Sequence, residues 1–226
     1  ALDPQTDPPT GNPAPVFRQV AGGANTWTEI EFTFTGLPAT PTTYNQLVIK
    51  PDNPDGSDGE TTTEERVFYF DDLLLTDGGG SGDGGCTDTP VAATSLPVDF
   101  ESCESFISSF SSIGDGGVVP SLDANPSQSG INTSDNVLKV VRASGINRWG
   151  GVQNSFPAGV IDITTQVFKI KVYSSVADVT YRFELALDPQ TDPVTGNPAP
   201  VFRQVTGGAN TWTEIEFTFT GLPATP

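Results

Sequence analysis

The chain contains no histidine and no methionine, and only ten of its 226 residues are lysine or arginine. Without histidine it cannot form a Ser-His-Asp or Cys-His catalytic group, nor a metal centre with histidine ligands. No run of 18 apolar residues occurs, so no segment is predicted to span a membrane. The chain is therefore expected not to be an enzyme and not to insert into a membrane, with hydrolysis of a glycoside by a carboxylate pair, Glu101 with Asp72, as the alternative.

The scarcity of basic residues contrasts with 28 aspartates and glutamates, which leave a net charge of -18. Nucleic acids and anionic membranes are bound mainly through clustered lysine and arginine, so neither is an expected partner. A surplus of carboxylates favours solubility and the binding of divalent cations.

The most conspicuous feature present is a repeat. Ala1–Pro41 recurs as Ala186–Pro226, and the two copies agree at 39 of 41 positions. Such agreement is typical of a tandem array in which each unit, here 185 residues, folds as one module. We therefore expect the chain to be part of a longer protein and to begin and end inside a module, although a processed short subunit is an alternative.

A glycine-rich stretch, "TDGGGSGDGGCTDTP" at 76–90, divides the chain. Five glycines within 78–84 disfavour regular structure and indicate a linker. The predicted organisation is the C-terminal part of one repeat at 1–77, a linker at 78–93, and the N-terminal part of the next repeat at 94–226. A complete module would then need strands from a covalent neighbour or from another copy of the chain.

Alternating apolar residues predict strands. "WTEIEFTFT" and "VFKIKVY" place apolar side chains on one face and polar ones on the other. Further strands are predicted at Val16–Val20, Gln46–Lys50, Arg66–Leu75, Leu96–Phe100, Val137–Arg142, Gly150–Phe156 and Val179–Leu187. No segment has the spacing of apolar residues that is typical of an amphipathic helix. The expected fold class is all-β, an antiparallel β-sandwich of the jelly-roll kind, with Trp27 and its copy Trp212 in the core or at a strand edge.

The two cysteines, Cys86 and Cys103, enclose a short loop. A disulfide is the expected state in an oxidising compartment, and a buried pair of free thiols is the alternative. The disulfide interpretation predicts an extracellular or cell-surface location.

Four segments, "LPVDFES", "NPSQSGINTSDNVLKVVRASGINRWGGV", "NTWTEIEFTFTG" and "VFYFDDLLL", resemble carbohydrate-binding-module jelly rolls of the galactose-binding-like type. Similar domains occur in secreted multidomain proteins of Bacteroidetes. The resemblance implies a structural Ca²⁺ held by Glu101 and Asp72, with Asp71 and Asp99 as neighbours; solvated carboxylates at strand ends are the alternative.

The resemblance also implies a sugar stacked on an exposed aromatic side chain. Trp149, flanked by Arg148, is the candidate, with a place in the core as the alternative. The acidic loops "DPQTDPPTGNP" and "PDNPDGSDGE" are interpreted as turns and solvated rims.

The sequence supports two functions as expectations. The first is a structural repeat of an extracellular filament or surface adhesin, whose partners are copies of itself, because uniform repeats give uniform head-to-tail contacts. The alternative is a carbohydrate-binding module of a secreted protein that degrades polysaccharides. A fold by itself is a weak argument for function, and near-identical repeats favour the first.

Overall fold

The computed structural model describes residues 45–54, 56–75, 86, 89–114, 116–157, 159–161, 167–186, 201–207 and 209–218. The first copy of the repeat, with its predicted strands, lies outside these residues. The described part is built from strands without any helix, so it offers no helix long and apolar enough to cross a membrane.

Twelve strands are described. In chain order they are β1 (Gln46–Pro51), β2 (Arg66–Leu75), β3 (Val91–Ala92), β4 (Glu104–Ser105), β5 (Ser108–Phe110), β6 (Val118–Ala124), β7 (Asn136–Arg142), β8 (Gly151–Ser155), β9 (Val167–Ser174), β10 (Val179–Ala186), β11 (Val201–Gly207) and β12 (Thr213–Thr218).

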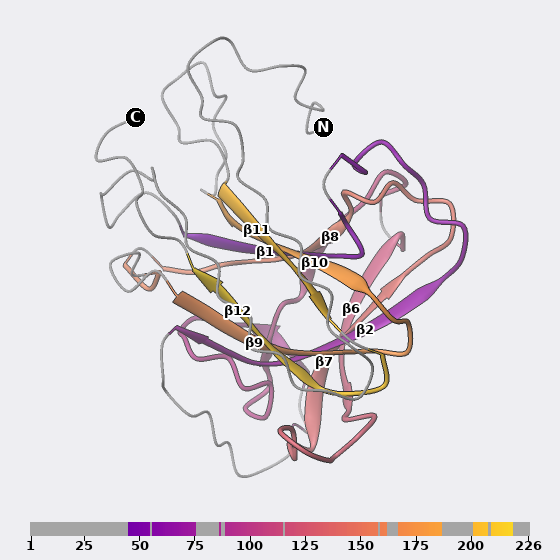
Figure 1. The fold of residues 1–226 in the computed structure, drawn as a ribbon. Coiled ribbons are helices and arrows are strands. Elements are labelled where there is room, and N and C mark those ends of the chain that lie inside the picture. The colour runs from indigo at the N-terminus through magenta and orange to yellow at the C-terminus, as the bar shows by residue number, and fades with distance from the viewer. Residues whose placement is uncertain are drawn as a thin grey trace.

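The strands form two large antiparallel sheets that pack face to face as a β-sandwich (Figure 1). The first sheet has the order β11-β10-β1-β8-β5, and the second has the order β12-β9-β2-β7-β6. A small parallel pair, β3 with β4, completes the described fold. The predicted fold class is confirmed.

The core lies between the sheets, and strands such as β9 alternate buried and partly exposed residues. Along β9, Phe168, Ile170 and Val172 are buried while the two lysines between them reach solvent. Phe183 of β10 lies against Phe217 of β12, with ring centroids 4.9 Å apart. Burial of each such side chain contributes about 1.5–3 kcal/mol to folding.

Most predicted strands in the described residues are present, within a residue or two of their predicted bounds. The exception is Leu96–Phe100, where only Val98 makes a bridge, to Leu73 of β2. Strand β6 was not predicted, because Pro120 interrupts its pattern and its exposed Val119 breaks the alternation. Proline fits here because β6 is the outer strand of its sheet.

Strands from both sides of the glycine-rich stretch share the same two sheets. β1 lies between β10 and β8, and β2 lies between β9 and β7. The first 75 residues therefore supply a central strand to each sheet. The division of the repeat at 78–93 stays a prediction about a longer array.

The start of β1 and the end of β12 lie at the same end of the sandwich. β9 and β10 lie in different sheets and are joined by four residues, so the end of β9 and the start of β10 lie at one end of the sandwich. The start of β9 and the end of β10 therefore lie at the other end. Gln46 of β1 pairs with Ala186 of β10, and Thr218 of β12 pairs with Val167 of β9. Both pairs therefore lie at the end of the sandwich away from the connection between β9 and β10.

Candidate functional site

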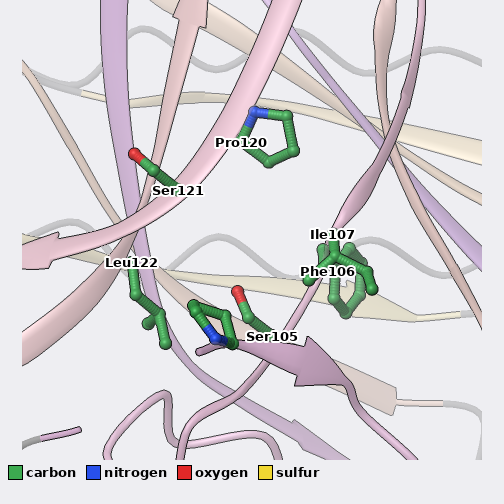
Figure 2. Close-up of a pocket in the computed structure, with 7 residues that line it drawn as sticks. Ser105, Phe106, Ile107, Pro120, Ser121 and Leu122 are labelled. Atoms are coloured by element: carbon green, nitrogen blue, oxygen red, sulfur yellow. The ribbon is translucent and has the colours of Figure 1, made fainter. Parts of the chain in front are cut away.

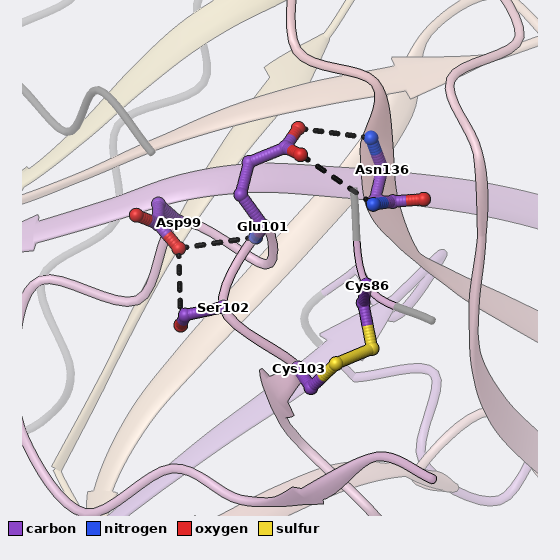
Figure 3. Close-up of a disulfide and its surroundings, with 6 residues drawn as sticks. All are labelled: Cys86, Asp99, Glu101, Ser102, Cys103 and Asn136. Carbon is purple, nitrogen blue, oxygen red and sulfur yellow. Dashed lines mark hydrogen bonds between the residues drawn. A yellow bond between two sulfur atoms is a disulfide. The ribbon is translucent and has the colours of Figure 1, made fainter. Parts of the chain in front are cut away.

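The predicted disulfide is present between Cys86 and Cys103, which are 17 positions apart (Figure 3). It ties the chain before β3 to the residue that precedes β4. The Val91 amide donates to the Cys103 carbonyl at 3.0 Å, so the small parallel pair begins directly beside the disulfide.

The acids implied for calcium lie on two segments that the fold brings together. Leu73 and Val98 exchange backbone hydrogen bonds of 2.9 and 3.0 Å, which sets Asp71 and Asp72 beside the Asp99–Glu101 segment. The pairing of β2 with β9 shifts its register between Asp71 and Leu74. Asp72 there has a φ of 44°, in the left-handed region that aspartate tolerates better than most residues.

Glu101 and Asp99 both have protein partners. The Glu101 carboxylate accepts from the Asn136 amide at 2.9 Å and from the Asn136 side chain at 3.4 Å (Figure 3). Asp99 Oδ1 accepts from the Glu101 amide at 3.0 Å and from the Ser102 hydroxyl at 3.4 Å. These contacts join the segment before β4 to the start of β7.

Asp71 and Asp72 differ sharply from each other. Asp72 forms an ion pair with Lys171 of β9. Asp71 is fully buried, and among the described residues its Oδ2 has no hydrogen-bond partner. Burial, together with the neighbouring charge of Asp72, raises the pKa of the Asp71 carboxyl to about 7, although the Asp72 amide donates to its Oδ1 at 2.9 Å and thereby favours the ionised form.

The fit of these residues to calcium is partial. No group of three or more His, Cys, Asp or Glu side chains among the described residues is gathered so as to hold a metal ion. All four predicted carboxylates have a protein partner: Asp99, Glu101 and Asp71 Oδ1 accept hydrogen bonds, and Asp72 pairs with a lysine. Asp71 alone presents a buried oxygen without a partner, which is the kind of hard donor that Ca²⁺ takes.

The predicted sugar-binding residues lie in different surroundings from each other. Trp149 is partly exposed and stacks on Phe110, with ring centroids 5.9 Å apart and planes 9° apart. Lys50 Nζ lies 5.7 Å from the centre of the Phe110 ring. The neighbouring Arg148 instead pairs with Asp52 at 2.8 Å and with Glu60 at 3.4 Å.

Sequence reasoning missed the cluster of arginines around Asp52, which it placed on a solvated rim. Asp52 is only 6% exposed and pairs with Arg66 at 2.9 Å as well as with Arg148. The fully buried Arg142 donates to the carbonyls of Pro51 and Asn147, and burial lowers the pKa of its guanidinium to about 10. Arg142 follows Leu138 and Val140 on the buried face of β7, and an arginine at such a position was the sequence signal that could have revealed this cluster.

Trp212 is buried as predicted, and its indole Nε1 donates to Asn125 Oδ1 at 3.2 Å and to the Ser127 carbonyl at 3.0 Å. The contacts hold the start of β12 against the loop after β6.

A shallow cavity of about 400 Å³ lies away from these residues. It separates Pro120–Leu122 of β6 from Ser105–Ile107, with Pro90 completing its lining (Figure 2). No charged side chain lines it, so it has no group for acid-base or metal chemistry.

The described residues define a disulfide-bonded β-sandwich domain in which one oxygen of a buried carboxylate, Asp71 Oδ2, has no hydrogen-bond partner. Comparison of the chain with protein-family models, with curated proteins and with solved structures finds no match.

Proposed function

We propose that this chain is a structural repeat of an extracellular filament or surface adhesin, without catalytic activity. The repeated segment carries the proposal. Its second copy supplies β11 and β12, the outer strands at one side of both sheets. The repeated segment therefore belongs to the two sheets of the sandwich. Its core residues Trp212, Ile215 and Phe217 all have identical counterparts in the first copy.

The disulfide and the charge distribution support a place outside the cell. Disulfides persist in oxidising compartments. Seven of the ten basic residues are paired with acids in the described part of the chain: Lys50, Arg66, Lys139, Arg148, Lys169, Lys171 and Arg182. The surplus charge that remains at the surface is negative, which favours solubility.

A structural Ca²⁺ is part of the proposal, and Asp71 supports it. A cation beside its unpartnered oxygen would neutralise the buried carboxylate and link β2 to the Asp99–Glu101 segment. Asp72 and Glu101, the two ligands implied by the resemblance, would complete the site after release from Lys171 and Asn136. The test is the melting temperature in Ca²⁺ and in chelator. A rise with Ca²⁺ is expected, and identical curves would contradict the metal site.

Membership of an array is tested by the mass of the native chain. An antibody against this sequence should detect, on a reducing and denaturing gel of culture medium and surface extract, a species many times heavier than 23.7 kDa. A native chain close to 23.7 kDa, or one confined to the cell interior, would contradict the proposal.

The alternative, binding of polysaccharide, is favoured by one observation, the partly exposed Trp149 stacked on Phe110 beside Lys50. Flat aromatic surfaces with nearby polar groups suit sugar rings. Pull-down on cellulose, xylan and agarose tests it. Trp149→Ala should weaken binding about tenfold or more, while Tyr69→Ala, which removes a partly exposed ring from the second sheet, should leave binding unchanged. Absence of binding by the unmodified chain would reject this alternative.

A further inference from the structure

The chain carries two copies of the sequence that forms the edge strands β11 and β12, and the structure describes one place for it. β11 and β12 form the outer strands beside β10 and β9. The first copy, Ala1–Pro41, has the same residues at all but two positions, and it runs directly into the segment that forms β1. Its own structure lies outside the described residues.

The contacts that hold β11 and β12 depend on residues that both copies possess. Trp212, Ile215 and Phe217 are buried, and Gln204 donates to the Asn53 carbonyl at 2.7 Å. Their counterparts in the first copy are Trp27, Ile30, Phe32 and Gln19. Of the two differences, Ala21 in place of Thr206 removes one hydroxyl contact to Thr180, of 3.4 Å. The other, Pro9 in place of Val194, lies outside the described strands.

The connection is also geometrically feasible. Thr33 is the counterpart of Thr218, the last residue of β12, and twelve residues, 34–45, separate it from β1. Because β12 stops at the end of the sandwich where β1 starts, this segment must cross the gap between the sheets and two strand spacings, roughly 15–20 Å. Twelve residues reach about 40 Å when extended.

We infer that the chain contains two overlapping versions of the same sandwich, one formed by 45–226 and one by 1–186. In the second version, Ala1–Pro41 occupies the edge beside β9 and β10 in place of β11 and β12. The two versions are circular permutations of each other that share β1 to β10. The inference goes beyond the proposed function and does not depend on where the protein works. In a tandem array, each copy could complete the sandwich before it or the one after it.

Paired core substitutions in the full chain test the exchange. Phe217→Ala alone, or Phe32→Ala alone, should lower the folding equilibrium constant only about twofold, because the other copy replaces the damaged one. The double variant should lower it at least about a hundredfold, as expected when a buried phenylalanine is truncated. If Phe217→Ala alone is as damaging as the double variant, the inference is wrong.

Engineered cysteines provide a second test that does not require a damaged core. Glu216 lies opposite Lys169 in the pairing of β12 with β9, and Glu31 is its counterpart in the first copy. Lys169→Cys should form an intrachain disulfide with Glu31→Cys, and likewise with Glu216→Cys when that pair is introduced instead. Asp7→Cys, in the same copy but outside the predicted strands, is the negative control and should form little.

The absence of a disulfide between positions 31 and 169, where the 216–169 pair forms one, would overturn the inference. Both experiments use the purified chain. Their failure would leave the proposed array untouched, because the array is judged separately by the mass of the native protein.

Discussion

Protonation of Asp71 is expected to affect stability between acidic and neutral pH. Its carboxyl is fully buried, with a pKa raised to about 7, whereas the unfolded chain should titrate near the ordinary value of 3.8. A raised pKa in the folded state means that the folded state holds the proton more tightly. The stabilisation from this group is therefore complete below about pH 4 and is lost as the pH rises to about 7.

The corresponding prediction concerns Asp71→Asn. In chelator, the free energy of unfolding of the unmodified chain should fall by at most about 4 kcal/mol between pH 4 and pH 7 because of this group. Asp71→Asn should flatten that fall, since the amide carries no charge. It should also abolish any stabilisation by Ca²⁺, which needs the ionised carboxylate. Urea denaturation at several pH values measures both effects.

The matched control is Glu65→Gln, which removes one negative charge from an exposed position. It should leave the pH dependence of stability as it is in the unmodified chain. A persistent fall in Asp71→Asn would show that other carboxyl groups cause the pH dependence.

Trp212 and Asp52 show which buried side chains can be identified from the sequence and which cannot. Burial of Trp212 was predictable, because it starts an alternating apolar strand. Burial of Asp52 was not, since an aspartate between prolines in an acidic loop has the composition of a solvated turn. Its environment depends on Arg66 and Arg148, which are 14 and 96 positions away in the chain. Local patterns carry no information about partners at such separations.

At the scale of elements, the disulfide acts on the smallest pair of strands. β3 and β4 contribute only two residues each, so their few backbone hydrogen bonds cannot hold the pair together without help. Cys86–Cys103 closes the loop that contains β3 and thereby reduces the freedom of the unfolded chain. The short loop between the two cysteines favoured this bond over a pair of free thiols if the compartment is oxidising, and the structure contains the bond.

Removal of the disulfide should be measurable. The double variant Cys86→Ser with Cys103→Ser should lose about 3 kcal/mol of unfolding free energy, as expected for a loop of this length. Urea denaturation with and without reductant provides the comparison. Reductant should lower the stability of the unmodified chain to that of the variant and leave the variant unchanged. A variant as stable as the oxidised chain would show that the strands hold this region by themselves.

Strand prediction succeeded for the inner strands and for the edge strands β11 and β12, and it failed at the other two edges, β5 and β6. β9 and β10 alternate clearly because each has one face in the core. β5 and β6 are outer strands, where fewer side chains are buried and the pattern is weaker. Leu96–Phe100 has a strand-like composition but pairs only through Val98. Composition predicts which residues are buried better than it predicts which backbone groups pair.

At the scale of the whole molecule, chain order and spatial order differ. β1 and β2 come before the glycine-rich stretch, yet each is the central strand of a five-stranded sheet. Sequence reasoning predicted that a complete sandwich needs strands from a covalent neighbour or from another copy of the chain, whereas in this structure β1 and β2 of the same chain take the central positions. Register between distant segments depends on tertiary packing, which periodicity alone does not specify.

The central position of β1 and β2 predicts how the chain responds to a cut in the glycine-rich stretch. A protease site inserted between Gly80 and Ser81 should allow cleavage into two fragments that stay together, because buried side chains on both strands, among them Leu47, Ile49, Phe68 and Phe70, hold the first fragment in the core. The disulfide lies entirely in the second fragment, so no covalent bond would join them. The nicked protein should elute as one species in native buffer and as two in denaturant. Separation in native buffer would show that β1 and β2 are not integral to this sandwich, and that the strands after the linker must be completed from another copy of the chain.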